Sequence, residues 1–193
     1  MAVKKLNGAD YLLLLLYLDN CKPIKGAIRL TKMMYLFEKE IEPLLKKGGV
    51  ISDNLPEFIA YNFGPFSKDL YEQVEFFQNI QFISTRNINS IEDMGEVDDW
   101  KGIWFDGVAD PMDLGPEVDS KYMEYSLMDR GKNFVAQSLL EVFSADQIKL
   151  LEQFKRKIVR TTARDILRYV YTKYPDSAEN SIIKKDILGV DDD

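Results

Sequence analysis

Histidine does not occur among the 193 residues. The imidazole side chain is the usual general base near neutral pH, the commonest zinc ligand and a member of most serine and cysteine triads. Its absence excludes those sites, although a site made of carboxylates alone, as in glycosidases, needs no histidine. We therefore expect a protein that is not an enzyme and has no catalytic residue, metal site or cofactor.

Cysteine is nearly as scarce, since Cys21 is the only one. A single thiol cannot form an intramolecular disulfide, and without histidine to activate it we expect an incidental thiol rather than a nucleophile. The one apolar run that suggests a membrane, residues 11–18, is far shorter than the roughly 20 residues of a spanning helix. Polar residues and Pro23 follow this run where a signal peptide would need small residues. These features predict a cytoplasmic protein that does not enter a membrane.

Positive charge is in deficit, because 25 lysines and arginines face 32 aspartates and glutamates, which gives a net charge of −7. Phosphates are bound through clustered lysine and arginine, so this balance disfavours non-specific attraction to nucleic acid. Many carboxylates lie in an acidic insert, residues 90–120: Glu92, Asp93, Glu96, Asp98, Asp99, Asp106, Asp110, Asp113, Glu117 and Asp119. Because Trp100 and Trp104 lie in the same insert, we expect it to steer a basic partner and to offer aromatic anchors.

Hydrophobic residues, in contrast, make up 46% of the chain, which is enough to bury the core of a single domain over residues 1–193. Helical periodicity predicts a first helix over residues 9–20, whose leucine run is apolar all round and therefore buried on several sides. A second helix is expected over residues 28–41, until Pro43 and Gly48-Gly49 end it.

The middle of the chain combines strand and helix signals. An aromatic stretch over residues 58–63 is expected to be extended, and Ser67 is placed to cap a third helix that reaches Phe77. Three short segments are expected to form a small antiparallel sheet: residues 82–84, 103–105 and 122–127.

The C-terminal part is predicted to be helical. A helix is expected from residue 129 to residue 143, and the pairs Ser144 with Gln147 and Thr162 with Asp165 match capping boxes that open two more helices. The whole pattern predicts an α+β fold that is mostly helical with a small antiparallel sheet.

The order of these elements is typical of a winged-helix domain. We expect a winged-helix-like core over residues 9–143, which contains the acidic insert, and a C-terminal helical extension over residues 144–188. DNA recognition through the usual surface is disfavoured, because the helix from residue 67 to 77 carries three carboxylates and only Lys68 as a cation. The alternative is a DNA-binding regulator that uses basic residues of the late helices: Lys155, Arg156, Arg160, Arg164 and Arg168. Runs of charged residues like this one are more often helix faces exposed to solvent than nucleic-acid sites.

Two segments carry a resemblance to a known family. Residues 29–36 read Arg-Leu-Thr-Lys-Met-Met-Tyr-Leu, and residues 60–71 read Ala-Tyr-Asn-Phe-Gly-Pro-Phe-Ser-Lys-Asp-Leu-Tyr. Together they resemble the signature of the Panacea family, phage-associated and antitoxin-like proteins that include a proteolysis adaptor. The resemblance covers roughly residues 9–80. Asn62-Phe63 departs from the usual residues before Gly-Pro, and the acidic insert is larger than the family leads us to expect, which indicates an outlying member.

The resemblance implies a non-enzymatic domain that binds a toxin or delivers a protein to a protease, and it brings no catalytic residues. A homodimer is compatible with the sequence. Together with the charge pattern, the motif gives a set of partner-binding candidates: Tyr35, Tyr61, Phe63, Gly64, Pro65, Phe66, Tyr71, Trp100 and Trp104.

Overall fold

The structure, a computed structural model that describes residues 5–88 and 123–189, is organised around helix α1 (Gly8–Cys21). Its residues Tyr11 to Leu16 are each at most 1% exposed, so the helix has no solvent face. A capping box opens the helix, because the Asn7 side chain accepts from the Asp10 backbone and the Asp10 side chain accepts from the Asn7 backbone. The predicted burial of the leucine run is confirmed.

Helix α2 (Ala27–Leu36) is also buried at every position. It passes into a π-helical turn, η1 (Phe37–Ile41), and then into α3 (Glu42–Lys47). The prediction that Pro43 ends this helix was wrong. The wide turn before it bonds the Glu42 N–H to the Phe37 carbonyl, and Pro43 then lies in the first turn of α3, where its missing N–H is tolerated. The helix ends at Gly48-Gly49, as expected.

The main sheet has three antiparallel strands in the order β2-β7-β6, namely β2 (Ile24–Lys25), β6 (Ile83–Asn87) and β7 (Met123–Leu127). Two of the predicted strands, at residues 82–84 and 122–127, are thereby confirmed. The strand expected at residues 103–105 lies outside the described residues. The third strand of the sheet is β2, whose two residues are too few to show the alternation that marks a strand in sequence.

Two smaller strand pairs complete the N-terminal half. β1 (Lys5–Leu6) runs parallel to β3 (Ile51–Ser52), and β4 (Ile59–Tyr61) forms a hairpin with β5 (Gly64–Phe66). Ser67 then caps α4 (Lys68–Asn79) by accepting a hydrogen bond from the Leu70 backbone. The order α1, β2, α2, α4, β6, β7 is that of a winged helix, and the fold is mostly helical α+β, as predicted.

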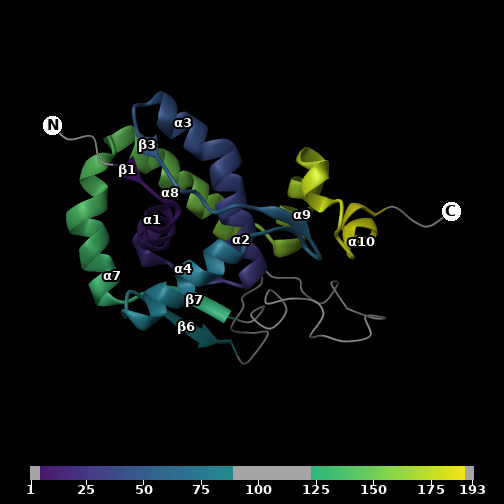
Figure 1. Ribbon diagram of the computed structural model, residues 1–193, viewed down its shortest axis with the longest axis horizontal. Helices are drawn as coiled ribbons and strands as arrows, with labels where there is room; N and C mark the ends of the chain where they lie inside the picture. The colour runs from purple at the N-terminus through teal and green to yellow at the C-terminus, as the bar shows by residue number, and fades with distance from the viewer. Residues whose placement is uncertain (1–4, 89–122, 190–193) are drawn as a thin grey trace.

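The C-terminal half is helical: α7 (Asp129–Phe134), η4 (Val135–Leu139), η5 (Leu140–Val142), α8 (Ala145–Arg160), α9 (Ala163–Lys173), η6 (Pro175–Ala178) and α10 (Lys184–Leu188). Ser144 and Gln147 form the predicted capping box of α8, and the Thr162 side chain caps α9. Figure 1 shows α1 surrounded by α2, α4, α7 and α8, while α9 and α10 lie beyond α2. One hydrophobic cluster extends from Leu6 to Ile187, so these last helices share the core.

The C-terminal end of α1 is a left-handed turn. Asp19, Asn20 and Cys21 have φ angles of 54°, 55° and 55°, a conformation that costs roughly 1–2 kcal/mol for each residue with a side chain. Lys155 of α8 is completely buried beside this turn and donates from Nζ to the carbonyls of Leu16 (3.0 Å) and Leu18 (2.6 Å). A lysine thus satisfies carbonyls that the helix leaves without partners.

Burial lowers the pKa of Lys155 from 10.5 to about 8, despite the nearby Asp19 carboxylate, which opposes the shift. Because the pKa is lower in the folded chain, the unfolded chain binds more protons between these values, and folding gains stability as pH rises. We expect unfolding free energy to increase by on the order of 3 kcal/mol from pH 8 to 10.5, relative to Lys155→Met. Urea unfolding of both proteins at several pH values tests this, and parallel pH profiles would contradict it.

Candidate functional site

The two motif segments that carry the family resemblance meet inside the protein. Lys32 of α2 is completely buried and donates from Nζ to the Pro65 carbonyl of β5 at 3.1 Å. The hydroxyls of Thr31 and Tyr71 share a hydrogen bond at 3.1 Å. These contacts fix β5 and the start of α4 against α2. The motif therefore has a structural role that the sequence alone does not separate from partner binding.

Four of the predicted partner-binding residues lie in this interior. Tyr35 is 5% exposed and packs edge-on against the rings of Phe58 and Tyr174, and Phe63 is 0% exposed. Gly64 and Pro65 are also buried. Tyr35 and Phe63 were expected to contact a partner, but in the described part of the structure their rings are buried and offer it no open surface.

The remaining members of that set differ in their positions. Tyr61, Phe66 and Tyr71 are half-buried and form a row of rings, with centroids 5.2 Å apart for Tyr61 and Phe66 and 5.5 Å apart for Phe66 and Tyr71. Part of each ring remains accessible. Trp100 and Trp104, like the acidic insert at 90–120, lie outside the described residues.

The predicted basic set is not a continuous cationic surface. Lys155 was expected at the surface, and this was wrong because it is buried against the end of α1. Arg160 is exposed. The other three are paired with carboxylates of the same chain: Arg156 with Asp19 at 3.1 Å, Arg164 with Asp186 at 3.3 Å and Arg168 with Asp165 at 3.1 Å. These pairs agree with the solvated-face interpretation.

A groove that the sequence did not indicate lies between α2 with η1, α8 and α9. We name it the α8 groove. Its volume is about 360 Å³, and its apolar floor consists of Leu36, Ile41, Leu150, Phe154, Ile158 and Ile166. Polar side chains form its rim: Glu40, Gln153, Lys157, Thr161, Asp165 and Tyr169. Such a concave apolar surface with a few polar groups is the usual form of a binding site.

The groove is elongated along α8. That helix contributes residues 150, 153, 154, 157 and 158, at the three- and four-residue spacing of one helix face, and Thr161 follows at its end. At 1.5 Å per residue, this stripe extends over about 16 Å, or three helical turns. Periodicity predicts the apolar face of α8, but Phe154 and Ile158 there are naturally taken as core residues. The stripe is accessible because η1 and α9 do not close over it, and the sequence does not show this.

The polar end of the groove is formed around Glu40, which the π-helical turn η1 carries. Oε1 of Glu40 accepts three hydrogen bonds, from Tyr169 Oη at 2.8 Å, Lys173 Nζ at 2.9 Å and Tyr174 Oη at 3.0 Å. Lys173 Nζ also donates to Tyr169 Oη at 2.8 Å. All three donors belong to α9 and its C-terminal cap. Glu40 therefore ties the π-helical turn to α9 at the rim of the groove.

The electrostatics of this cluster hold each group in its usual charge state. Burial by itself would raise the pKa of Glu40, but the hydrogen bonds from Lys173, Tyr169 and Tyr174 outweigh it and lower the pKa. The bonds to Tyr169 and Glu40 raise the pKa of Lys173, and burial followed by the bond to Glu40 raises the pKa of Tyr174 to about 12. These three pKa values move away from neutrality, whereas proton transfer is favoured by a pKa near the working pH. The arrangement suits anchoring better than acid–base chemistry.

A second groove lies on the outer face of α4, and we name it the α4 groove. Its volume is about 560 Å³, and the loop before β4 and the helix line it with Asn54, Leu55, Pro56, Glu57, Asp69, Glu72, Gln73 and Phe76. Three of these residues are acidic. In the described residues, 5–88 and 123–189, no three of the potential metal ligands, these acids included, are placed so that they could hold one metal ion.

No protein-family model, curated protein or solved structure matches this chain. Among the described residues, no helix is long and apolar enough to cross a membrane.

A substitution of Glu40 tests the cluster that it forms with Tyr169, Lys173 and Tyr174. Because its pKa is lowered below 4.5 in the folded chain, its stabilising effect is complete above that pH and is lost as pH falls through the folded pKa. We expect Glu40→Gln to reduce the free energy of unfolding by about 1 kcal/mol at pH 7, and this deficit to shrink below pH 4. Denaturant unfolding at both pH values measures it. Glu38→Gln, which loses only a pair with the adjacent Lys39, is the control, and an equal, pH-independent effect of both would refute the role.

Gly64 tests the packing of the motif. It has a φ of 83°, and an added Cβ would lie 2.6 Å from Cε1 of Tyr171, whereas Gly49 has a φ of 88° and open space around it. Gly49→Ala therefore measures the backbone cost alone, roughly 1–2 kcal/mol. We expect Gly64→Ala to cost about 1–3 kcal/mol more because of the overlap with the ring. Thermal or urea unfolding compares the two variants, and equal losses would show that the Tyr171 contact is unimportant.

Proposed function

We propose that this chain is a non-enzymatic protein-binding module of the antitoxin or proteolysis-adaptor type, phage-associated and acting in the cytoplasm. The α8 groove is the observation that carries this proposal. The resemblance of residues 29–36 and 60–71 to the Panacea family agrees with it, and the partner would then be a toxin or a protein destined for a protease.

The shape of the α8 groove favours a helix as its occupant. A helix bound in a groove inserts side chains spaced at i, i+3, i+4 and i+7, which repeat along its length. The stripe of α8 from Leu150 to Ile158, ending at Thr161, extends over a similar length and presents the same spacing. An amphipathic partner helix of about three turns would fit alongside it and cover Phe154.

The polar rim of the α8 groove would orient the bound helix. Glu40 and Asp165 lie on the side of η1 and α9, and Lys157 lies on α8. The hydrogen bonds that Glu40 receives from described residues all reach Oε1, so Oε2 remains an acceptor for a partner's donor. Charged rim contacts of this kind contribute more to orientation and association rate than to affinity.

The alternative, a winged-helix regulator that binds DNA through the late helices, has less support. Three of the arginines in question are paired with carboxylates, and α4, the reading helix of this topology, carries acids on its exposed positions. Replacing Arg156, Arg160 and Arg164 by glutamine would abolish a gel shift if DNA were bound there.

A variant at Leu150 tests the α8 groove. Leu150 is half-buried at one end of the groove, so Leu150→Arg introduces a charge into its apolar floor, whereas Leu150→Met conserves volume. We expect a partner recovered from native lysate by the wild-type protein to be lost with Leu150→Arg, at least about tenfold, and retained with Leu150→Met. Quantitative mass spectrometry of the three purifications measures this, after circular dichroism shows that the variants are folded.

Crosslinking identifies the bound segment. A photo-reactive residue in place of the exposed Gln153 should crosslink to one helix of that partner, at positions three or four apart, and the same residue at Glu179 should not. The proposal would be overturned if Leu150→Arg recovered the same proteins as the wild type. It would also be overturned if the purification recovered only nuclease-sensitive DNA.

A further inference from the structure

The outer face of α4 presents a groove with both apolar and acidic lining residues, and nothing in the described structure covers it. Phe76 is 57% exposed, one of the most exposed large apolar side chains among the described residues, and it lies in the α4 groove with Leu55 and Pro56. Exposed apolar area of this kind, bordered by polar residues, is typical of interaction sites. The proposed function does not use this face.

The charges around Phe76 are mainly negative. Glu57, Asp69 and Glu72 line the groove. Asp69 also accepts a hydrogen bond from the Glu57 backbone N–H at 3.2 Å, which holds the loop against α4. Lys68 pairs with Glu72 at 3.0 Å, but both side chains are well exposed, at 81% and 60%, so this pair is weak and exchangeable.

Gln73 adds an unsatisfied acceptor to the groove. Its side chain lines the groove, and its Oε1 atom is buried without a hydrogen-bond donor among the described residues. A buried carbonyl oxygen is normally paired, and a bound segment would supply an N–H donor once the Gln73 side chain turned outward into the groove.

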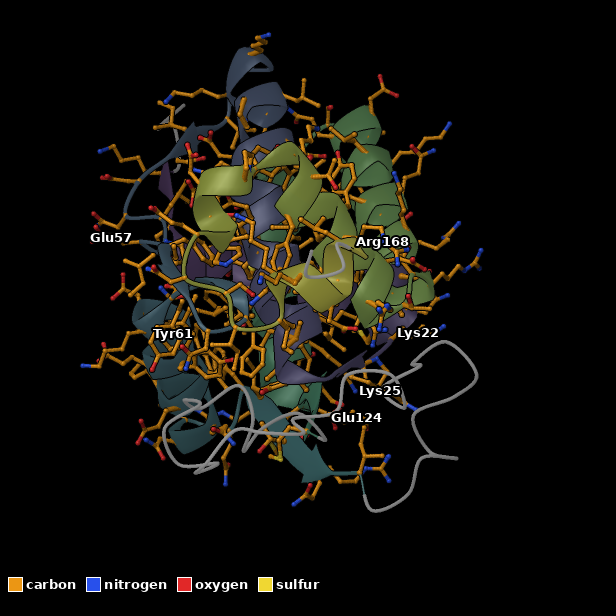
Figure 2. The ribbon with its side chains drawn as sticks, turned by 90° about the vertical axis from the view of Figure 1, so that its right-hand side faces the viewer. Lys22, Lys25, Glu57, Tyr61, Glu124 and Arg168 are labelled. Atoms are coloured by element: carbon orange, nitrogen blue, oxygen red, sulfur yellow. The ribbon has the colours of Figure 1, made fainter. Side chains whose placement is uncertain are left out.

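The position of α4 in the fold indicates what its outer face can bind. In a winged helix, α4 is the element that enters the DNA major groove, and here its outer face would repel phosphate. Figure 2 places Glu57 on one side of the view and Lys22, Lys25 and Arg168, together with Glu124, on the other. The face that usually binds a polyanion is therefore complementary to a cation.

We propose that the α4 groove binds a cationic segment of a protein partner, in which an apolar side chain next to lysine or arginine packs against Phe76. The carboxylates of Glu57 and Glu72 pair with the basic residues, and the Gln73 side chain turns outward to receive an N–H donor. This inference stands apart from the α8 groove, so either surface can fail without the other.

Peptide display on the folded, full-length chain tests the proposal without a known partner. We expect selection from a random library to enrich peptides that combine lysine or arginine with an adjacent aliphatic or aromatic residue. Binding of a selected peptide should weaken about tenfold in Glu57→Gln/Glu72→Gln, with a smaller dependence on salt. Asp69 is left unchanged because it holds the loop.

Matched controls separate the groove from net charge. Glu141→Gln/Glu152→Gln changes the net charge equally on residues that do not line the groove, and Ile182→Ala removes a comparably exposed side chain (49%) elsewhere, as a match for Phe76→Ala. Selected peptides should keep their affinity for both controls and for Leu150→Arg, and lose it for Phe76→Ala. Enrichment of acidic or uncharged peptides, no enrichment at all, or equal binding by the groove variants and their controls would each overturn the proposal.

Discussion

The structure depends on one constraint, that α1 has no face suited to water. Its residues from Tyr11 to Leu16 are all buried, so a helix of this composition is stable only when other elements cover it on every side. The elements from α2 to β7 provide part of that cover, and α7 and α8 provide the rest. The C-terminal helices are consequently part of the same core. Lys155 extends this dependence to polar groups, because it reaches the carbonyls at the end of α1 from α8.

The second buried helix, α2, shows why a motif can indicate a fold without locating a function. Arg29 donates to the carbonyls of Lys25 and Thr161, and Lys32 donates to that of Pro65. Each of these cations is buried where it joins segments far apart in sequence, and an unpaired charge there would be costly. The residues that make the chain resemble the Panacea family are therefore largely ones that hold the fold together.

Local signals were sufficient for much of the fold. The caps at Asn7, Ser144 and Thr162 and the helix after Ser67 follow from side chains that bond within three residues of themselves, so the sequence predicts them. The strand β2 and the burial of Lys155 depend on partners about a hundred residues or more away, and no local pattern indicates them. The same holds for the α8 groove, which exists because η1 and α9 leave one stripe of α8 uncovered.

The distribution of charge agrees with the proposal that this winged-helix topology serves protein binding rather than DNA binding. Nucleic acid requires a continuous cationic surface, yet three of the four arginines of α8 and α9, Arg156, Arg164 and Arg168, are paired with carboxylates of their own chain. Each pair is individually weak, but together they remove net charge from that face while leaving the acids of α4 largely unopposed. The acids Glu57, Asp69 and Glu72 make the outer face of α4 locally negative, and the exposed Phe76 adds an apolar contact that electrostatic attraction alone does not provide.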